Sequence, residues 1–357
     1  MRAVHRDMAW ELAPGLTARH AFCLSPEGRA DLRQVALRWL ASAPPVDATW
    51  EYHASKQPSV EARTLEIAGT RVDLGEMASV ASWDPTRRRV DVRLWHPSFE
   101  KVPQPVRMQL GFLFLDSLLG EDEVERWIGS IDLLDAPTGG RTPDELKAEI
   151  ERHRAEPATE ERWILGEFDG PGGRAIVLAD AALKRIDHPF ADQHVGITVV
   201  LEDGGLPDDA LAAELNVEED DLQARMAGTA VYAGRTTRPG ARTMHFAAEN
   251  LDAVKTVIDA WALVLPPRRL KVNFEADMDW SFRGRELGSA EAAARGRATG
   301  PSASGATGMT ATTCIRQAEE WELRRFSTLG SRGGRPCPET SNAPCCCCWP
   351  CWRSPSS

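Results

Sequence analysis

The regular spacing of apolar residues in this chain stops near Leu287, and this limit sets how much of the chain can fold. Before that point, apolar residues recur with the periods of strands and helices. After it, residues 288–357 show neither period and are rich in Gly, Ala, Ser and Thr, then in Cys, Pro and Arg. Such a composition cannot bury enough apolar surface to offset the entropy lost on ordering. We therefore predict two folded domains followed by a tail at 288–357.

The tail holds seven of the eight cysteines, including a run of four at 345–348. A zinc site needs two ligand pairs, and the Cys348-x2-Cys351 spacing supplies only one, since Cys337 stands alone and no histidine follows His245. Disulfides would need an oxidising compartment. Arginine far outnumbers lysine, as in G+C-rich genes, and a wrong reading frame of such a gene yields Arg, Pro, Ser, Gly, Cys and Trp. The tail is therefore interpreted as disordered or out of frame, and no cofactor is predicted.

The second region, residues 158–287, alternates strand and helix patterns in the order ββ-β-α-ββ-α-β. A hairpin turns at Gly-Pro-Gly-Gly, and residues 194–202 alternate apolar and polar side chains as a strand does. Two short helices follow, the second capped by Asn216, and a second hairpin turns at Pro239-Gly240. A helix at 251–261 and a final strand complete the region. This order predicts an α+β fold with antiparallel sheet and helices on one face.

The first region, residues 1–157, has the same mixed character, and we expect the same arrangement of an antiparallel sheet with helices on one face. Its predicted elements are strands at 20–25, 49–53 and 59–69, a helix after residue 26, a hairpin at 82–97, helices at 105–119 and from 120, a strand at 128–135 and a helix from 142. Thr142 and Glu145 have the spacing of a capping box. The charged, proline-broken stretch at 152–161 favours a domain boundary near residue 157.

Charge and composition narrow the classes of function. The net charge is −11, and eight of the 42 basic and five of the 53 acidic residues follow residue 287, so residues 1–287 carry −14. An acidic body disfavours direct nucleic-acid binding and favours a basic protein partner. The sequence contains no stretch of about 18 apolar residues, so no membrane span is predicted. Its beginning lacks the apolar run of a secretory signal, and we therefore expect a cytoplasmic protein. Cys23 is expected to be a small buried residue.

Two groups of charged residues are candidates for binding. Glu121, Asp122 and Glu125 lie at the start of a predicted helix, where acids complement the helix dipole and could also contact a partner. Arg235, Arg238 and Arg242 surround the Pro239-Gly240 turn and could bind an acidic group or a phosphate. Solvated charges are the alternative in both cases.

A third cluster could bind a metal. Asp187, His188, Asp192 and His194 lie within eight residues, in or beside a loop, and all can be metal ligands. No helical His-x-x-x-His pair and no distant third ligand accompany them, so ordinary loop residues are the preferred interpretation. No residue is assigned a catalytic role.

The second region resembles the family called domain of unknown function 695 over roughly residues 161–283. The resemblance is carried by "VGITVVLEDGGLPDDALAAELNVEEDDLQARM", by "AVYAGRTTRPGARTMHF" and by "DMDWSF". This family is similar in style to the ribonuclease E activity regulator B family, whose members bind and inhibit an RNA-degrading enzyme. The resemblance implies a ferredoxin-like module and a protein-binding role, and it transfers no catalytic residues.

These observations favour a binding protein over an enzyme. We expect a cytoplasmic regulator or immunity-like inhibitor that binds a protein partner, with its acidic surface steering a basic one. The alternative is a metal-dependent hydrolase that uses the Asp/His cluster or the helix acids. An enzyme should bring several of these groups together in one cleft, whereas a binder should present an open sheet or an apolar patch.

Overall fold

The computed structural model describes residues 4–59, 64–67, 69–137, 139–157, 162–170, 173–202, 204–288 and 309–310. Within these residues the chain is α+β, as the sequence predicts. The predicted tail lies outside them, apart from Gly288 and the short strand β15 (Met309–Thr310). No helix in the described part is long and apolar enough to cross a membrane.

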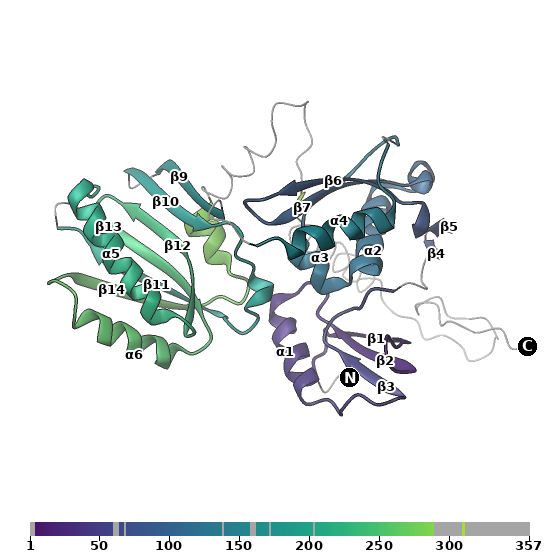
Figure 1. Ribbon diagram of the computed structural model, residues 1–357, viewed down its shortest axis with the longest axis horizontal. Coiled ribbons are helices and arrows are strands. Elements are labelled where there is room, and N and C mark those ends of the chain that lie inside the picture. Colours follow the sequence, from purple (N-terminus) through teal and green to yellow (C-terminus); the bar gives the residue numbers. More distant parts are fainter. Residues whose placement is uncertain are drawn as a thin grey trace, which may run out of the picture. The chain divides into compact units, whose positions relative to one another are not determined.

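The second region forms one antiparallel sheet of six strands, in the order β14-β11-β13-β12-β10-β9 (Figure 1). Its elements are β9 (Trp163–Gly170), β10 (Gly173–Asp180), β11 (Gln193–Val200), α5 (Asp209–Met226), β12 (Ala230–Arg238), β13 (Ala241–Ala248), α6 (Leu251–Ala262) and β14 (Arg269–Ala276). From β11 to β14 the order of elements along the chain is βαββαβ. In the sheet, β11 and β13 are the two middle strands of these four, with β14 on one side and β12 on the other. This is the ferredoxin-like arrangement, extended at β12 by the β9–β10 hairpin.

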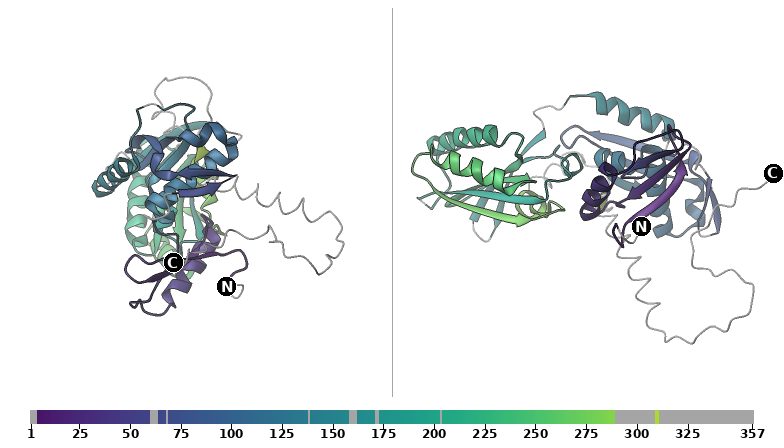
Figure 2. Two further views of the ribbon diagram at one scale, coloured as in Figure 1. Left: turned by 90° about the vertical axis from the view of Figure 1, so that its right-hand side faces the viewer. Right: turned by 90° about the horizontal axis from the view of Figure 1, so that it is seen from below.

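Helices α5 and α6 cover one face of this sheet (Figures 1 and 2). Alternate residues of β11, among them Val195 and Ile197, point into the core with Phe246 of β13. The helices contribute Leu222 and the fully buried Trp261. Full burial of each such side chain stabilises the fold by about 1.5–3 kcal/mol, so the period-two and helical patterns in the sequence place this core.

The opposite face is covered in part by the segment that follows β14. The carboxylate of Asp277 accepts hydrogen bonds from the backbone N–H groups of Ser281 (2.8 Å) and Phe282 (2.7 Å), which bends the chain back over the sheet. Phe282 and Trp280 are then buried against residues of β10 and β12. The "DMDWSF" segment therefore covers part of this face of the sheet.

The first region contains several smaller sheets. The strands are β1 (Ala9–Pro14), β2 (His20–Ser25) and β3 (Trp50–His53) in one sheet, β4 (Thr64–Ile67) and β5 (Thr70–Asp73) in a hairpin, and β6 (Ala78–Asp84), β7 (Arg89–Trp95) and β8 (Ile128–Leu133) with β15 in another. Two pairs, β2–β3 and β7–β8, are parallel, which the sequence analysis did not predict. Helices lie between these strands in the chain, and such crossovers allow parallel pairing.

The helices of the first region are α1 (Ala30–Ala41), α2 (Gln104–Leu119), α3 (Glu121–Trp127) and α4 (Pro143–Ala155). Helix α4 begins with the predicted capping box between Thr142 and Glu145. Gly120 separates α2 from α3 and has φ +84°, a conformation that favours glycine. A β-carbon there would lie 3.1 Å from the Lys56 carbonyl oxygen, so this junction packs closely against the loop after β3.

Two local predictions were incomplete or wrong. Helix α5 is continuous and is capped by Asp208, whose side chain accepts from the N–H of Leu211, so Asn216 does not start a second helix. Asn216 instead accepts a hydrogen bond from Arg242 at 2.8 Å. Strands β1 and β5 were also not predicted, because each is short and bordered by Pro or Gly.

Candidate functional site

The acids at the start of α3 are engaged inside the fold. Glu121 is 7% exposed, and its carboxylate accepts hydrogen bonds from Ser25 Oγ (2.7 Å) and from the backbone N–H groups of Gly28 (3.0 Å) and Lys56 (3.1 Å). Burial raises the pKa of Glu121, although these donors oppose the shift. This carboxylate therefore connects α3 to the segments that follow β2 and β3.

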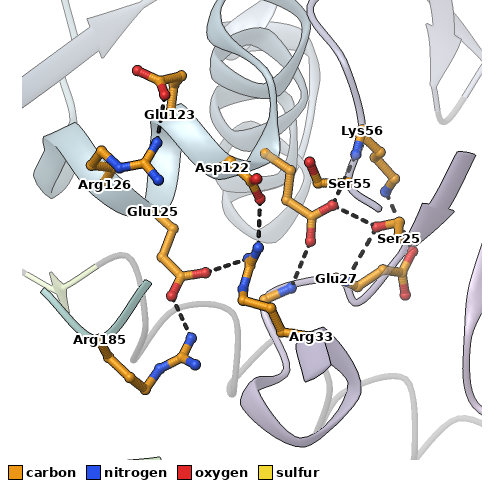
Figure 3. Close-up of polar contacts among 12 residues, drawn as sticks. Ser25, Glu27, Arg33, Ser55, Lys56, Asp122, Glu123, Glu125, Arg126 and Arg185 are labelled. Atoms are coloured by element: carbon orange, nitrogen blue, oxygen red, sulfur yellow. Dashed lines mark hydrogen bonds and ion pairs between the residues drawn. The ribbon is translucent and has the colours of Figure 1, made fainter. Parts of the chain in front are cut away.

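Asp122 and Glu125 are bound by the same buried arginine (Figure 3). Arg33 of α1 contacts Asp122 at 2.5 Å and Glu125 at 2.6 Å, and its side chain is 3% exposed. The other oxygen of Glu125 lies 2.5 Å from Arg185, in the turn before β11. The three predicted acids therefore bind residues of this chain.

The four predicted metal-binding residues do not converge. Asp187 accepts from Arg126 Nε at 2.8 Å, and His188 stacks on Trp280 with ring centroids 6.0 Å apart. Asp192 accepts from the side-chain amides of Gln34 and Gln193. Among the described residues, no group of three or more His, Cys, Asp or Glu side chains is placed to hold a metal ion.

His194 belongs to a buried polar chain that crosses the sheet. Its Nε2 lies 3.1 Å from Nδ1 of His245, whose Nε2 lies 3.3 Å from the Thr236 hydroxyl. The imidazole of His194 also stacks on Phe282, with centroids 4.2 Å apart. Burial lowers the pKa of both histidines, that of His245 to about 3, so both are neutral near pH 7.

The three arginines around the second hairpin turn lie on two faces of the sheet. Arg235 and Arg242 face α5, where Arg235 Nη1 lies 3.0 Å from both oxygens of Glu219 and Arg242 lies 3.6 Å away. Glu219 is 2% exposed and also accepts from the Tyr232 hydroxyl. Arg238 lies on the other face, is 46% exposed and pairs with Glu286. The structure therefore leaves one of the three exposed.

Cys23 is buried, as expected. It is 3% exposed on β2, and burial raises the pKa of its thiol far above the usual value. A thiol in this state is protonated and unreactive, so Cys23 acts as a packing residue.

Strand β1 carries a cluster of exposed apolar side chains that the sequence analysis did not single out. Trp10 is 52% exposed, Leu12 is 60% exposed, and Leu16 just after the strand is 59% exposed. The side chains of Trp10 and Leu12 point to the same face, because they are two positions apart on a strand. Trp10 stacks against Phe22 of β2, with centroids 6.2 Å apart, which holds the indole in place.

The backbone of β1 is also an open edge. The sheet order is β1-β2-β3, so within the described part of the chain β1 pairs with β2 alone. Pro14 ends the strand and has no N–H to donate, which leaves Ala9 to Ala13 as the segment that can pair with another strand. An exposed edge with large apolar side chains is a site for pairing with another chain. We refer to residues 9–14 as the β1 edge.

Comparison with known proteins gives one match. Residues 185–283 match the model of a family of unknown function, DUF695. The match begins at the turn containing Arg185, covers β11 to β14 and the two helices, and ends at Arg283. It thus contains the ferredoxin-like module and omits the β9–β10 hairpin and the first region. No curated protein and no solved structure matches the chain.

The β1 edge could have been found from the sequence. The string "AWELAP" alternates Trp10 and Leu12 with less apolar neighbours, which is the strand period. The exposure of this edge could not be predicted, because it depends on how far α1 extends over the sheet. That helix packs Trp39 on Phe22, at a centroid distance of 5.5 Å, and leaves Trp10 outside the buried cluster.

Proposed function

We propose that this protein acts by binding a protein partner through the β1 edge, as a cytoplasmic regulator or immunity-like inhibitor. The observation that supports this role is the combination, on one strand, of an unpaired backbone and the exposed side chains of Trp10 and Leu12. Monomeric proteins usually protect such edges with charge, proline or a covering loop. Within the described residues, the features of this kind on β1 are Glu11 and Pro14.

The partner we propose is an extended segment with alternating apolar side chains and a basic character. Backbone hydrogen bonds to β1 would supply part of the affinity, and apolar side chains of the segment would pack on Trp10 and Leu12. Glu11 points to the opposite face of the strand and is exposed, so it would meet a basic residue there. The charge of −14 on residues 1–287 would increase the association rate of a basic partner.

We extend the proposal to a regulatory role by analogy with the ribonuclease E activity regulator B family, which the domain of unknown function 695 family resembles in sequence style. The alternative function, a metal-dependent hydrolase, has less support, because its candidate ligands separate into different contacts within the described residues. The protein-binding proposal rests on the β1 edge alone.

The proposal can be tested by site-specific photocrosslinking in the native host. A photoreactive amino acid replaces Leu12 in the full-length chain, and in a matched control it replaces Val217, which is 71% exposed on α5. We expect one protein to be crosslinked from position 12 and not from position 217. Crosslinking from both positions alike, or a second copy of this chain as the product at position 12, would contradict the proposal.

Affinity for the purified partner gives the quantitative test. Trp10→Ser combined with Leu12→Ser should weaken binding by at least about tenfold, because apolar anchors at the centre of an interface each contribute about 1–3 kcal/mol. Leu263→Ser, at an 87% exposed position after α6, should leave the affinity unchanged. Equal loss in both variants would mean that general exposure, and not the β1 edge, determines binding.

A further inference from the structure

A second site is a pocket of about 240 Å³ with a positively charged lining. Arg88 comes from the turn between β6 and β7, Arg126 and Trp127 come from α3, Arg162 precedes β9, and Lys184 lies in the loop after β10. Four cationic side chains but only two carboxylates, Asp180 and Asp187, line it. This local excess of positive charge occurs in a chain whose overall charge is −11.

The two carboxylates are already engaged by two of the cations. Asp187 accepts from Arg126 Nε at 2.8 Å, and Asp180 lies 3.5 Å from Arg162. Arg88 donates to the carbonyl of Glu156, and Lys184 donates to the carbonyl of Arg88 at 3.0 Å. Within the described part of the chain, neither Arg88 nor Lys184 has a carboxylate within ion-pair distance.

Lys184 is the unusual member of the group. It is 5% exposed, and a buried ammonium without a counter-ion costs several kcal/mol. The pKa of Lys184 is lowered to about 7, mainly by burial and also by Arg89, Arg88 and Arg126, whereas Asp187 opposes the shift. An anion in the pocket would supply the missing charge partner and raise this pKa.

The two cations that lack carboxylate partners both lie beside the indole ring of Trp127. Lys184 Nζ lies 3.7 Å from the centroid of the indole ring, and the Arg88 guanidinium lies 5.9 Å from it. The indole Nε1–H of Trp127 is buried and has no hydrogen-bond partner among the described residues. Two cations without carboxylate partners beside one ring are complementary to a ligand with several acceptor oxygens.

We propose that this pocket binds a small tetrahedral oxyanion, either inorganic phosphate or the phosphate group of a small ester, with Lys184 and Arg88 as its charge partners. The pocket volume accommodates a phosphate with a short organic group, and Leu183 and Ala182 provide an apolar wall for that group. The residues come from segments far apart in the sequence, Lys184 and Arg88 being 96 positions apart. No local motif marks the site, and the proposal is independent of the protein-binding role of the β1 edge.

Binding is measured on the full-length chain by calorimetry in a buffer free of other oxyanions. Sulfate is the first probe, because its charge is constant between pH 6 and 8.5, and inorganic phosphate and glycerol 3-phosphate are the second and third. We expect one sulfate per chain at pH 6. Tighter binding of glycerol 3-phosphate than of phosphate would identify an ester as the ligand, and equal or weaker binding would identify the free anion. The absence of saturable binding of all three probes would overturn the proposal.

The pH dependence tests Lys184 without a mutation. The ammonium is mostly charged at pH 6 and mostly neutral at pH 8.5, so sulfate should bind about tenfold or more weakly at the higher pH. The charged groups that face Lys184 are Arg88, Arg89, Arg126 and Asp187. Burial lowers the pKa of Arg89 only to about 10, and the hydrogen bond to Asp187 raises the pKa of Arg126, so neither of these two guanidinium groups loses its charge in this range. Burial lowers the pKa of His188, which opposes its protonation at the lower pH, and Asp187 acts in the other direction. A sulfate affinity that does not change between the two pH values would contradict the assignment.

Substitution separates binding from folding. Lys184→Met removes a buried charge that lacks a counter-ion, so the ligand-free variant should be at least as stable as the wild type while its sulfate affinity falls about tenfold or more. Arg88→Met provides a second variant with the same expected loss. Lys255→Met, at a 51% exposed position paired with Asp252 on α6, is the matched control and should bind sulfate normally. Unchanged binding in both pocket variants would overturn the proposal.

Discussion

The guanidinium of Arg33 lies 2.6 Å from the carboxylate of Glu125, although the two residues are 92 positions apart in the chain. Arg33 also holds Asp122, and Glu125 also holds Arg185, so one network connects α1, α3 and the turn before β11. The turn is where the DUF695 match begins. The acids that appeared as a surface cluster in the sequence therefore join the first region to the family module.

Arg33→Met should destabilise the protein by about 3 kcal/mol, because it leaves two carboxylates without their shared partner at a site where Arg33 is 3% exposed. The free energy of unfolding in urea is the measurement. Arg225→Met is the control: its pair with Asp221 on α5 is partly exposed and should contribute less than about 0.5 kcal/mol. Equal losses in the two variants would show that the Arg33 network does not stabilise the fold.

Arg235→Ala and Arg238→Ala should behave differently although they lie three positions apart. Arg235→Ala removes the cation whose Nη1 contacts both oxygens of the buried Glu219 and should cost about 2–3 kcal/mol of unfolding free energy. Arg238→Ala changes a half-exposed pair and should stay within about 0.5 kcal/mol of the wild type. A large loss for Arg238→Ala would contradict the placement of these side chains on opposite faces.

The His194–His245 pair should make the fold sensitive to acid. The pKa of His245 is about 3 in the folded state and near 6.5 in the unfolded chain, so the unfolded state binds the proton first and stability falls as the pH drops below about 6.5. Between pH 7 and pH 4 this one group should cost about 3 kcal/mol.

His245→Gln provides the comparison, since an amide can still bond to the Thr236 hydroxyl but does not titrate. The difference in unfolding free energy between wild type and variant should be constant above pH 7 and should shift in favour of the variant below it. Parallel pH profiles down to pH 4 would refute the contribution of His245.

Gly234→Ala should disrupt the β-bulge between Tyr232 and Gly234 on β12. Gly234 has φ +145°, and a β-carbon there would lie 2.2 Å from the Leu178 carbonyl oxygen, a backbone atom of the neighbouring strand. We expect a loss of about 2 kcal/mol or more in unfolding free energy. Gly205→Ala is the matched control, because a β-carbon at that position would have no atom within 4 Å, and it should be close to neutral.

The sequence alone predicted the α+β class, the order of elements in the second region and the capping box of Thr142. These features depend on residues close together in the chain: apolar residues two positions apart build β11, and a polar residue three positions before Glu145 starts α4. The strand β1 carries the strand period in Trp10 and Leu12, but it was not predicted, because Pro14 interrupts the pattern. The parallel pairs β2–β3 and β7–β8 were missed because periodicity does not specify strand direction.

Only the tertiary structure showed which charged residues are paired within the protein and which remain exposed and could contact a ligand or partner. Glu121, Asp122 and Glu125 look alike in the sequence, yet each is bound by a residue at least 60 positions away. The role of Lys184 could not be predicted from the sequence, because its pocket is formed together with Arg88 and Trp127, which lie far from it in the chain. Burial and charge pairing depend on distance in space, and only the packed fold determines that distance.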